Sequence, residues 1–221
     1  VGTPLNEHIE TDLKQIVNSI NSMIKFLREG HNIILRSTIA PGTTTFVKNY
    51  LEQKIDLRFG KNIFLSFCPE RIVEGQARIE FESLPQVIGS EDEESYNLAN
   101  EIFSKLAPEV LKTDFISAEL VKLFNNISRY INFSVANQFS IIADTYDVDI
   151  YNIIHMTNYK YPRGTIEQPG FTAGTCLRKD FGMINESIPY TDLLLSAWKI
   201  NEFMPKFLVE NTKKRIKINN K

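Results

Sequence analysis

The feature that most constrains the fold of this chain is one uninterrupted helical stretch from Ser117 to about Tyr146. At 1.5 Å per residue such a helix is about 45 Å long. Its apolar residues fall on one face, at Leu120, Phe124, Ile127, Ile131 and Val135. A helix of this length with an apolar face usually packs against another helix or a second subunit. We therefore expect a homodimer that forms through residues 117–146.

Upstream of this helix, the sequence alternates between short apolar runs and amphipathic stretches. The expected strands are "NIILRST", "NIFLSF", "QVIGS" and "EVLKT", and the expected helices cover 9–29, ended by Gly30, 43–55, which follows the Pro41-Gly42 turn, and 92–106. This order is typical of βαβ units and a parallel sheet. Helices are expected downstream over 149–157, over 176–187 and from about Thr191. The fold class is thus α/β plus all-α, with an α/β domain at 1–115 and a helical domain at 116–221.

Composition excludes several classes of protein. The 221 residues include 25 Lys and Arg against 27 Asp and Glu, with no basic stripe between aromatics, so a nucleic-acid partner is not expected. Apolar runs fall far short of the roughly 18–20 residues of a membrane span, and no signal peptide begins the chain, so we expect a cytoplasmic protein. The two cysteines, Cys68 and Cys176, have dissimilar surroundings; we expect both to be reduced, and no metal site.

The ends of the sequence suggest a piece of a longer protein. The first residue is Val1 rather than Met, and "VGTPLNE" resembles the end of a strand that leads into a loop. The last residues, "NTKKRIKINNK", form a basic helical stretch with no element after it.

Polar side chains follow three successive expected strands. Thr3 follows the strand remnant at Val1, Ser37 and Thr38 follow the next strand, and "CPERIVE" follows the third. In open parallel sheets, ligands bind outside the carboxyl ends of the strands, which predicts a binding edge here. The alternative is that Ser, Thr and Pro are simply common where strands become loops.

Glu70 and Glu74 lie four residues apart in the loop after a buried strand. Facing one crevice, one carboxylate can orient a ligand while the other handles water or a proton. Alternatively, Arg71 and Arg78 make them ordinary surface ion pairs.

On the long helix, Lys122 and Asn126 are separated by one turn and share a face. A Lys beside an Asn can supply two donors to a developing oxyanion, although a solvated polar stripe has the same spacing. Asn is a poor helix former, so helix propensity does not explain why this helix also carries Asn125, Asn132 and Asn137.

The loop "GFTAGTCLRKDF", residues 170–181, has the composition of a nucleophile's setting. Small residues such as Gly174 allow close approach, while Arg178, Lys179 and a helix start near Cys176 favour a thiolate. Asp180 lies four residues after Cys176. A structural cysteine at a helix entrance remains the alternative.

Five motifs occur in one order: "RST", "CPERIVEG", "LPQVIGS", "ELVKLFNN" and "GFTAGTCLRKD". Together they resemble the nucleotide-sugar 6-dehydrogenases, which include the UDP-glucose, UDP-N-acetylglucosamine, UDP-N-acetylmannosamine and GDP-mannose dehydrogenases. The resemblance implies an NAD-binding Rossmann domain, a central helical domain with a dimer-forming helix, and a C-terminal domain that closes over the nucleotide sugar. It implies that the G-x-G-x-x-G turn lies upstream of Val1 and the third domain beyond Lys221. The chain alone is then expected to bind NAD poorly and to be inactive.

The chemistry implied by the resemblance is a four-electron oxidation of a sugar C6 primary alcohol to a carboxylate with two NAD+. Cys176 then corresponds to the nucleophile that forms a thiohemiacetal and later a thioester. The other matched positions are Lys122 and Asn126 for the oxyanion, Asp180 and Thr38 for the catalytic water, Glu74 near the nicotinamide and the hydrolytic step, Glu70 in support, Thr3 and Thr38 beside the cofactor, and Phe171 and Gly174 along the sugar. Since "AGTCLRKD" departs from many relatives, the sugar stays open, and loop similarity favours a UDP-N-acetylhexosamine.

Other readings stay open. A two-electron hydroxyacid-type dehydrogenase would use Lys122 as its acid or base and leave Cys176 incidental. A Cys/His hydrolase would need one of His8, His31 or His155 near Cys176, and none of these lies in a motif. The helical part can also serve only as a dimerisation module.

Overall fold

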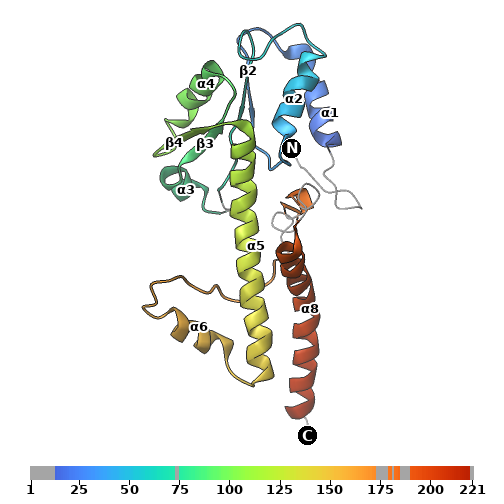
Figure 1. The fold of residues 1–221 in the computed structure, drawn as a ribbon, viewed down its shortest axis with the longest axis vertical. Coiled ribbons are helices and arrows are strands. Elements are labelled where there is room, and N and C mark those ends of the chain that lie inside the picture. Colours follow the sequence, from blue (N-terminus) through green and yellow to red (C-terminus); the bar gives the residue numbers. More distant parts are fainter. Residues whose placement is uncertain (1–12, 73–74, 173–178, 181, 185–189, 220–221) are drawn as a thin grey trace. The chain divides into compact units, whose positions relative to one another are not determined.

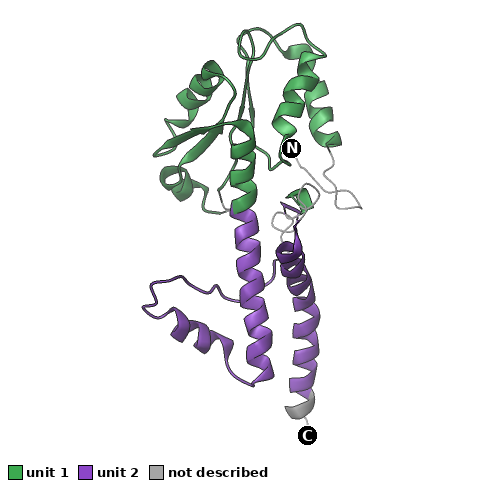
Figure 2. Cartoon of the chain, in the orientation of Figure 1, with its two compact units in different colours: residues 1–124, 182–186 green, residues 125–181, 187–221 purple. Residues whose placement is uncertain are grey.

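A computed structural model describes residues 13–72, 75–172, 179–180, 182–184 and 190–219. The chain divides into two compact units (Figure 2). Unit 1 comprises residues 1–124 and 182–186, and unit 2 comprises residues 125–181 and 187–221. Helix α5, Phe115–Thr145, begins in the first unit and continues into the second. The long helix expected over 117–146 is thus confirmed.

Unit 1 contains a four-stranded sheet in the order β1-β2-β3-β4 (Figure 1). Its strands are β1 Asn32–Leu35, β2 Phe64–Phe67, β3 Gln86–Gly89 and β4 Val110–Thr113. The pairs β1–β2 and β3–β4 are parallel, whereas β2 and β3 are antiparallel and meet at Phe67 and Gly89. The expected parallel sheet is therefore confirmed for the pairs β1–β2 and β3–β4, and the expectation is wrong for the pair β2–β3.

The reversal has a physical cause in the connection between β2 and β3. A parallel pair needs a crossover element that packs on a face of the sheet. Among its described residues, this connection has only the short helix α3, Ala77–Ser83, and none of the seven helical residues is buried. The sequence analysis did not predict α3, because "ARIEFES" has no apolar face for the core.

The remaining helices of unit 1 are α1 Lys14–Met23, α2 Thr43–Glu52 and α4 Glu93–Phe103. They confirm the expected helices with shorter bounds. The first ends earlier than Gly30, because a 3-10 turn over Ile24–Phe26 follows α1 and Leu27 is extended. Gly30, with φ +82°, lies in the turn that leads into β1.

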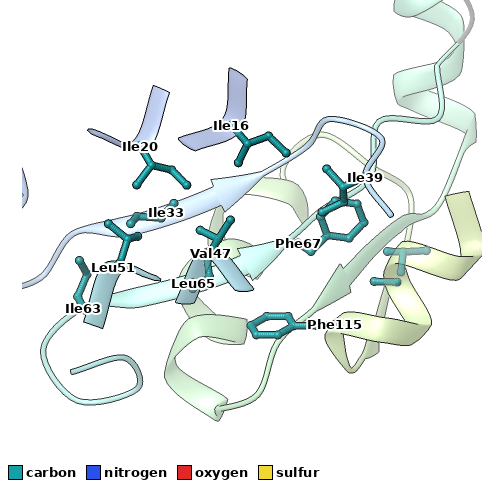
Figure 3. Packing of buried hydrophobic residues seen from close by; sticks show 12 residues of the cluster. Ile16, Ile20, Ile33, Ile39, Val47, Leu51, Ile63, Leu65, Phe67 and Phe115 are labelled. Atoms are coloured by element: carbon teal, nitrogen blue, oxygen red, sulfur yellow. The ribbon is translucent and has the colours of Figure 1, made fainter. Parts of the chain in front are cut away.

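The two faces of the sheet carry different cores, because successive side chains of a strand point to opposite faces. On one face Ile33 and Leu65 pack with residues of α1, α2 and α5 (Figure 3), and Val87 belongs to the same cluster. On the other, Ile88 and Cys68 pack with Ala99 and Phe103 of α4. Burying a large aliphatic or aromatic side chain contributes roughly 1.5–3 kcal/mol.

The start of α5 approaches the end of β3 very closely. Asp114 caps the helix, since its Oδ1 accepts a hydrogen bond of 2.9 Å from the Ser117 amide and its Oδ2 one of 2.6 Å from the Ser117 hydroxyl. A Cβ at Gly89 would lie 2.7 Å from the Ala118 Cβ and 2.8 Å from the Asp114 carbonyl oxygen. Glycine is therefore required where "LPQVIGS" ends its strand.

Unit 2 consists of the rest of α5, helix α6 Ile150–Asn158 and helix α8 Asp192–Asn219, which confirms two further expected helices. Buried positions lie on all three helices, at Ala136, Ala143, Ile154, Ala197 and Met204. The helix expected over 176–187 falls largely outside the described residues. Among the residues that the structure describes, no helix combines the length and apolar character needed to cross a membrane.

Candidate active site

The structure brings together two of the predicted site residues, Asn126 of α5 and Asp180. Both are buried, and the Asn126 side-chain amide donates a hydrogen bond to Asp180 Oδ2. The Lys179 ammonium lies 4.0 Å from Asp180 Oδ1 and offsets part of the buried charge. This hydrogen bond gives a reason for the presence of Asn126 in a helix, where asparagine is otherwise unfavourable.

Lys122, also on α5, precedes Asn126 by one turn and is partly buried. A solvated polar stripe would leave both side chains exposed, and Asn126 is only 7% exposed. Helix geometry keeps the two side chains on one face of α5, as the sequence predicted.

The loops that follow β1 and β2 are joined by an ion pair between Arg36 and Glu70. Glu70 Oε1 also accepts a hydrogen bond of 2.9 Å from the Ile72 amide. Burial opposes ionisation of Glu70, but the Ile72 amide and the Arg36 guanidinium outweigh it and hold its pKa below the ordinary value. The partner of Glu70 is thus Arg36 rather than Arg71, which donates to the Pro85 carbonyl oxygen.

Arg36 is itself fixed from two further sides. Its guanidinium lies 4.9 Å from the ring centroid of Phe103 and donates a hydrogen bond of 3.4 Å to Gln86 Oε1. Thr38, two residues further on, is partly buried. The ion pair therefore holds the strand end that carries Thr38.

Glu119 of α5 is a buried carboxylate that the sequence analysis did not single out. It accepts hydrogen bonds from the amides of Gly42 at 2.6 Å and Thr44 at 2.8 Å, and from the Thr44 hydroxyl at 2.6 Å. Burial raises its pKa, and these hydrogen bonds only partly oppose the effect. Glu119 supplies the N-cap of α2, because Gly42, with φ +89°, has no side chain to do so. In the sequence, Gly42 at the N-cap position was the signal that the cap of α2 comes from another part of the chain.

Carboxylates also close the starts of α4 and α5. Asp92 Oδ1 accepts from the Ser95 amide at 2.8 Å at the start of α4, and Asp114 performs this role for α5. A helix N-terminus binds phosphate through its free amides and its dipole. The N-termini of α2, α4 and α5 are thus already occupied by carboxyl groups of the chain itself.

Cys68 is a free, fully buried cysteine at the end of β2. Burial raises the pKa of its thiol to about 12, although Arg36 acts in the opposite direction. Such a thiol is inert as a nucleophile at neutral pH. This agrees with the expectation that Cys68 is reduced.

Of the remaining predicted site residues, the structure describes Phe171. Phe171 is 60% exposed and lines an open groove of about 420 Å³ with Leu208 and Val209 of α8. The predictions for Thr3, Glu74, Gly174 and Cys176 lie outside the described residues. Within the described ranges, no group of three His, Cys, Asp or Glu residues is arranged to hold a metal ion.

Comparison with family models gives one consistent match along the chain. The NAD binding domain of the UDP-glucose/GDP-mannose dehydrogenase family matches residues 1–107, and the central domain of the same family matches residues 116–202. The chain belongs to this family. Membership confirms the resemblance deduced from the five sequence motifs.

Two of the curated family members most similar to this chain carry the name UDP-N-acetyl-D-mannosamine dehydrogenase. The UDP-N-acetyl-D-mannosamine dehydrogenase of Methanocaldococcus jannaschii is 35% identical over 93% of this chain and 47% of its own length. The Pyrococcus horikoshii enzyme of the same name is 33% identical over 94% of this chain and 50% of its own length. The chain thus spans about half the length of these relatives.

Solved structures of family members agree with the fold. The UDP-D-ManNAc dehydrogenase from Pyrococcus horikoshii superposes with a TM-score of 0.92 at 31% identity, over 99% of this chain and 52% of that one. The native UDP-N-acetyl-mannosamine dehydrogenase Cap5O from Staphylococcus aureus gives 0.84 at 30% identity, over 98% and 52%. These matches confirm a Rossmann-like α/β part followed by a helical part with one long helix.

Proposed function

We propose that this chain belongs to an NAD-dependent nucleotide-sugar 6-dehydrogenase that oxidises the C6 primary alcohol of a UDP-N-acetylhexosamine to a uronate. Family membership supports the reaction class, and the names of the relatives favour the N-acetylhexosamine. The observation that carries the proposal is the buried hydrogen bond between Asn126 and Asp180, one turn of α5 beyond Lys122. Residues 1–115 would form part of the NAD-binding domain and residues 116–221 the central domain.

In this proposal, Cys176 adds as a thiolate to C6 of the intermediate aldehyde. A C–S bond forms, and the carbonyl electron pair moves onto oxygen to give a thiohemiacetal oxyanion. The Lys122 ammonium and the Asn126 amide donate hydrogen bonds to this oxyanion. An amide carries two N–H donors, so Asn126 keeps one available while Asp180 accepts the other.

After the second oxidation, the resulting thioester is hydrolysed. Asp180 and Thr38 hold the water, and Asp180 accepts its proton while the C–O bond forms and the Cys176 thiolate leaves. Glu74 supports this step, and Glu70 acts through the loop that it fastens to Arg36. A buried carboxylate that accepts an amide hydrogen bond suits the role of base, because the bond fixes its direction.

Among the described residues, Thr38 is the proposed contact for the nicotinamide end of NAD. Thr38, at the carboxyl end of β1, can border the nicotinamide together with Thr3 and Glu74. The pyrophosphate needs another cradle, because Glu119, Asp92 and Asp114 already occupy the N-termini of α2, α4 and α5. When bound, NAD accepts one hydride in each of the two oxidation steps.

We also propose that α5 forms a homodimer. Val135, Phe139 and Ile142 are between 38% and 45% exposed, and Tyr146, just after the helix, is 76% exposed. Their spacing of three and four residues puts them on one face. Sedimentation should show a dimer that Phe139→Glu converts to a monomer; an unaltered chain that stays monomeric at high concentration would refute this part.

The stoichiometry of the full-length protein tests the reaction. We expect two NADH per sugar oxidised and, in trapped reactions, substrate-derived mass on Cys176. One NADH per substrate, with activity that survives Cys176→Ala, would instead support a two-electron hydroxyacid-type dehydrogenase that uses Lys122.

A further inference from the structure

A chain of buried amide groups crosses unit 2 and ends on the backbone of Gly170. Asn201 of α8 donates to the Tyr130 carbonyl oxygen at 3.2 Å, and Asn137 of α5 donates to Asn201 Oδ1 at 2.9 Å. The Asn137 amide also donates to the Gly170 carbonyl oxygen at 3.0 Å, and its Oδ1 accepts from the Gly170 amide at 2.9 Å. Asn137 and Asn201 are buried, so breaking one of these bonds leaves a polar group without water.

The Asn137 side chain thus forms hydrogen bonds with both the backbone N–H and the backbone C=O of Gly170, as a neighbouring strand would. A single bond fixes a distance, whereas two opposed bonds also fix the orientation of the backbone. Gly170 immediately precedes Phe171, the first residue of the segment that leads to Cys176.

The same helix fastens the chain on the other side of Cys176. Asn126 bonds Asp180, four residues after Cys176, whereas Gly170 lies six residues before it. Asn126 and Asn137 are eleven residues apart, about three helical turns, so both lie on one face of α5 some 16 Å apart. Gly170 and Asp180, which are ten positions apart in the sequence and lie on either side of Cys176, are therefore both bonded to the same helix.

We propose that Asn137 is a positioning residue for the reaction of Cys176, a role distinct from that of the oxyanion donors Lys122 and Asn126. This inference rests on the proposed function, because it assumes that Cys176 is the nucleophile. A misplacement of about 1 Å at a reacting group can cost about 10²-fold in rate, so the orientation of Gly170 matters beyond its effect on stability.

The test follows Cys176 alkylation by iodoacetamide as a function of pH in the chain itself, with Cys68 replaced by Ala so that one thiol remains. In the otherwise unaltered chain we expect a thiol pKa below the free value of about 8.5. In Asn137→Ala we expect alkylation at pH 7 to slow by roughly tenfold as the pKa approaches that value. Hydrogen exchange should show that the Gly170 amide loses protection in the same variant.

Two further variants separate positioning from stability. Asn201→Ala breaks the same buried chain but leaves both bonds between Asn137 and Gly170, so it should lower Tm without changing the pKa of Cys176. Asn132→Ala, at an exposed position of α5, controls for helix propensity and should change neither quantity. If Asn137→Ala does not fold, Asn137→Ser takes its place, because a hydroxyl is too short to reach both backbone groups.

The outcomes distinguish the two proposals. A pKa of Cys176 at or above the free value in the otherwise unaltered chain would overturn the proposed nucleophile and, with it, the present inference. A lowered pKa that Asn137→Ala leaves unchanged, or that Asn201→Ala changes equally, would overturn the positioning role alone.

Discussion

Unit 1 and the connection of unit 2 that follows α6, described over residues 159–172, are held by different chemical groups. In unit 1, the carboxylates of Glu119, Asp92 and Asp114 close the starts of three helices. In the connection of unit 2, the neutral amides of Asn137 and Asn158 hold backbone groups of the chain. The stabilisation from a carboxylate cap includes attraction to the helix dipole and depends on pH. The stabilisation from an amide side chain has no such attraction and does not depend on pH.

The two kinds of side chain differ because the backbone groups that they bind differ. A helix N-terminus presents only N–H donors, so a carboxylate suits it. A loop that passes a helix presents both an N–H and a C=O, and an amide side chain can pair with both because it carries an acceptor oxygen and N–H donors. Asn158 repeats the pattern of Asn137, since it donates to the Ile166 carbonyl oxygen and accepts from the Ile166 amide, each at 2.8 Å.

The largest effect is expected for Glu119→Ala. Its loss leaves the amides of Gly42 and Thr44 without an acceptor in a buried place, which should lower the free energy of unfolding by on the order of 3–5 kcal/mol. Glu119→Gln keeps one carbonyl acceptor and should lose less than half of that. Urea unfolding of both variants measures the difference. Equal losses would show that the bulk of the side chain matters rather than its oxygens.

The next effect concerns Gly89, where β3 meets the start of α5. Gly89→Ala puts a methyl group against the Ala118 side chain and the Asp114 carbonyl oxygen, so we expect a loss of about 1–3 kcal/mol from overpacking. A Gly89→Ala, Ala118→Gly double variant should recover part of it. Thermal unfolding provides the measurement, and no recovery would assign the loss to the backbone contact alone.

Asn158→Ala tests the neutral anchors. The loss of two opposed hydrogen bonds to Ile166 should cost about 1–2 kcal/mol, and the same at pH 4 as at pH 7, because an amide does not titrate. Asn152→Ala, at an exposed position of the same helix, is the matched control. Urea unfolding at both pH values measures the loss, and a loss that grows or shrinks with pH would break the comparison between the two kinds of anchor.

The sequence predicted most helices and strands because their apolar residues recur at the helical or strand period. It missed α3, which buries nothing, and it also missed the antiparallel pairing of β2 with β3. It missed Glu119 because the cap of α2 comes from a residue 75 positions away along the chain. Local patterns carry no information about such a partner.

The candidate site shows the same division between local and distant information. Asn126 and Asp180 were identified by the order of the motifs, and their mutual hydrogen bond, across 54 residues, is visible only in the fold. Local sequence does not explain the excess of Asn on α5. Asn126 and Asn137 now have partners on other segments, whereas Asn125 and Asn132 are exposed and the structure gives no reason for them.

The smallest effect is expected at Asp114, which is exposed, whereas the other two carboxylate caps of unit 1, Asp92 and Glu119, are partly or fully buried. Hydrogen bonds from the Ser117 hydroxyl and amide hold its pKa below the ordinary value near 3.9. A lowered pKa in the folded state means that the stabilisation is complete above the unfolded pKa and is lost as the pH falls through the folded pKa. Because solvent screens an exposed group, we expect a contribution below about 1 kcal/mol. Asp114→Asn keeps an N-cap acceptor without titrating, so its unfolding free energy should fall less than that of the unaltered protein between pH 7 and pH 3; parallel pH profiles would mean that the charge of this cap contributes nothing.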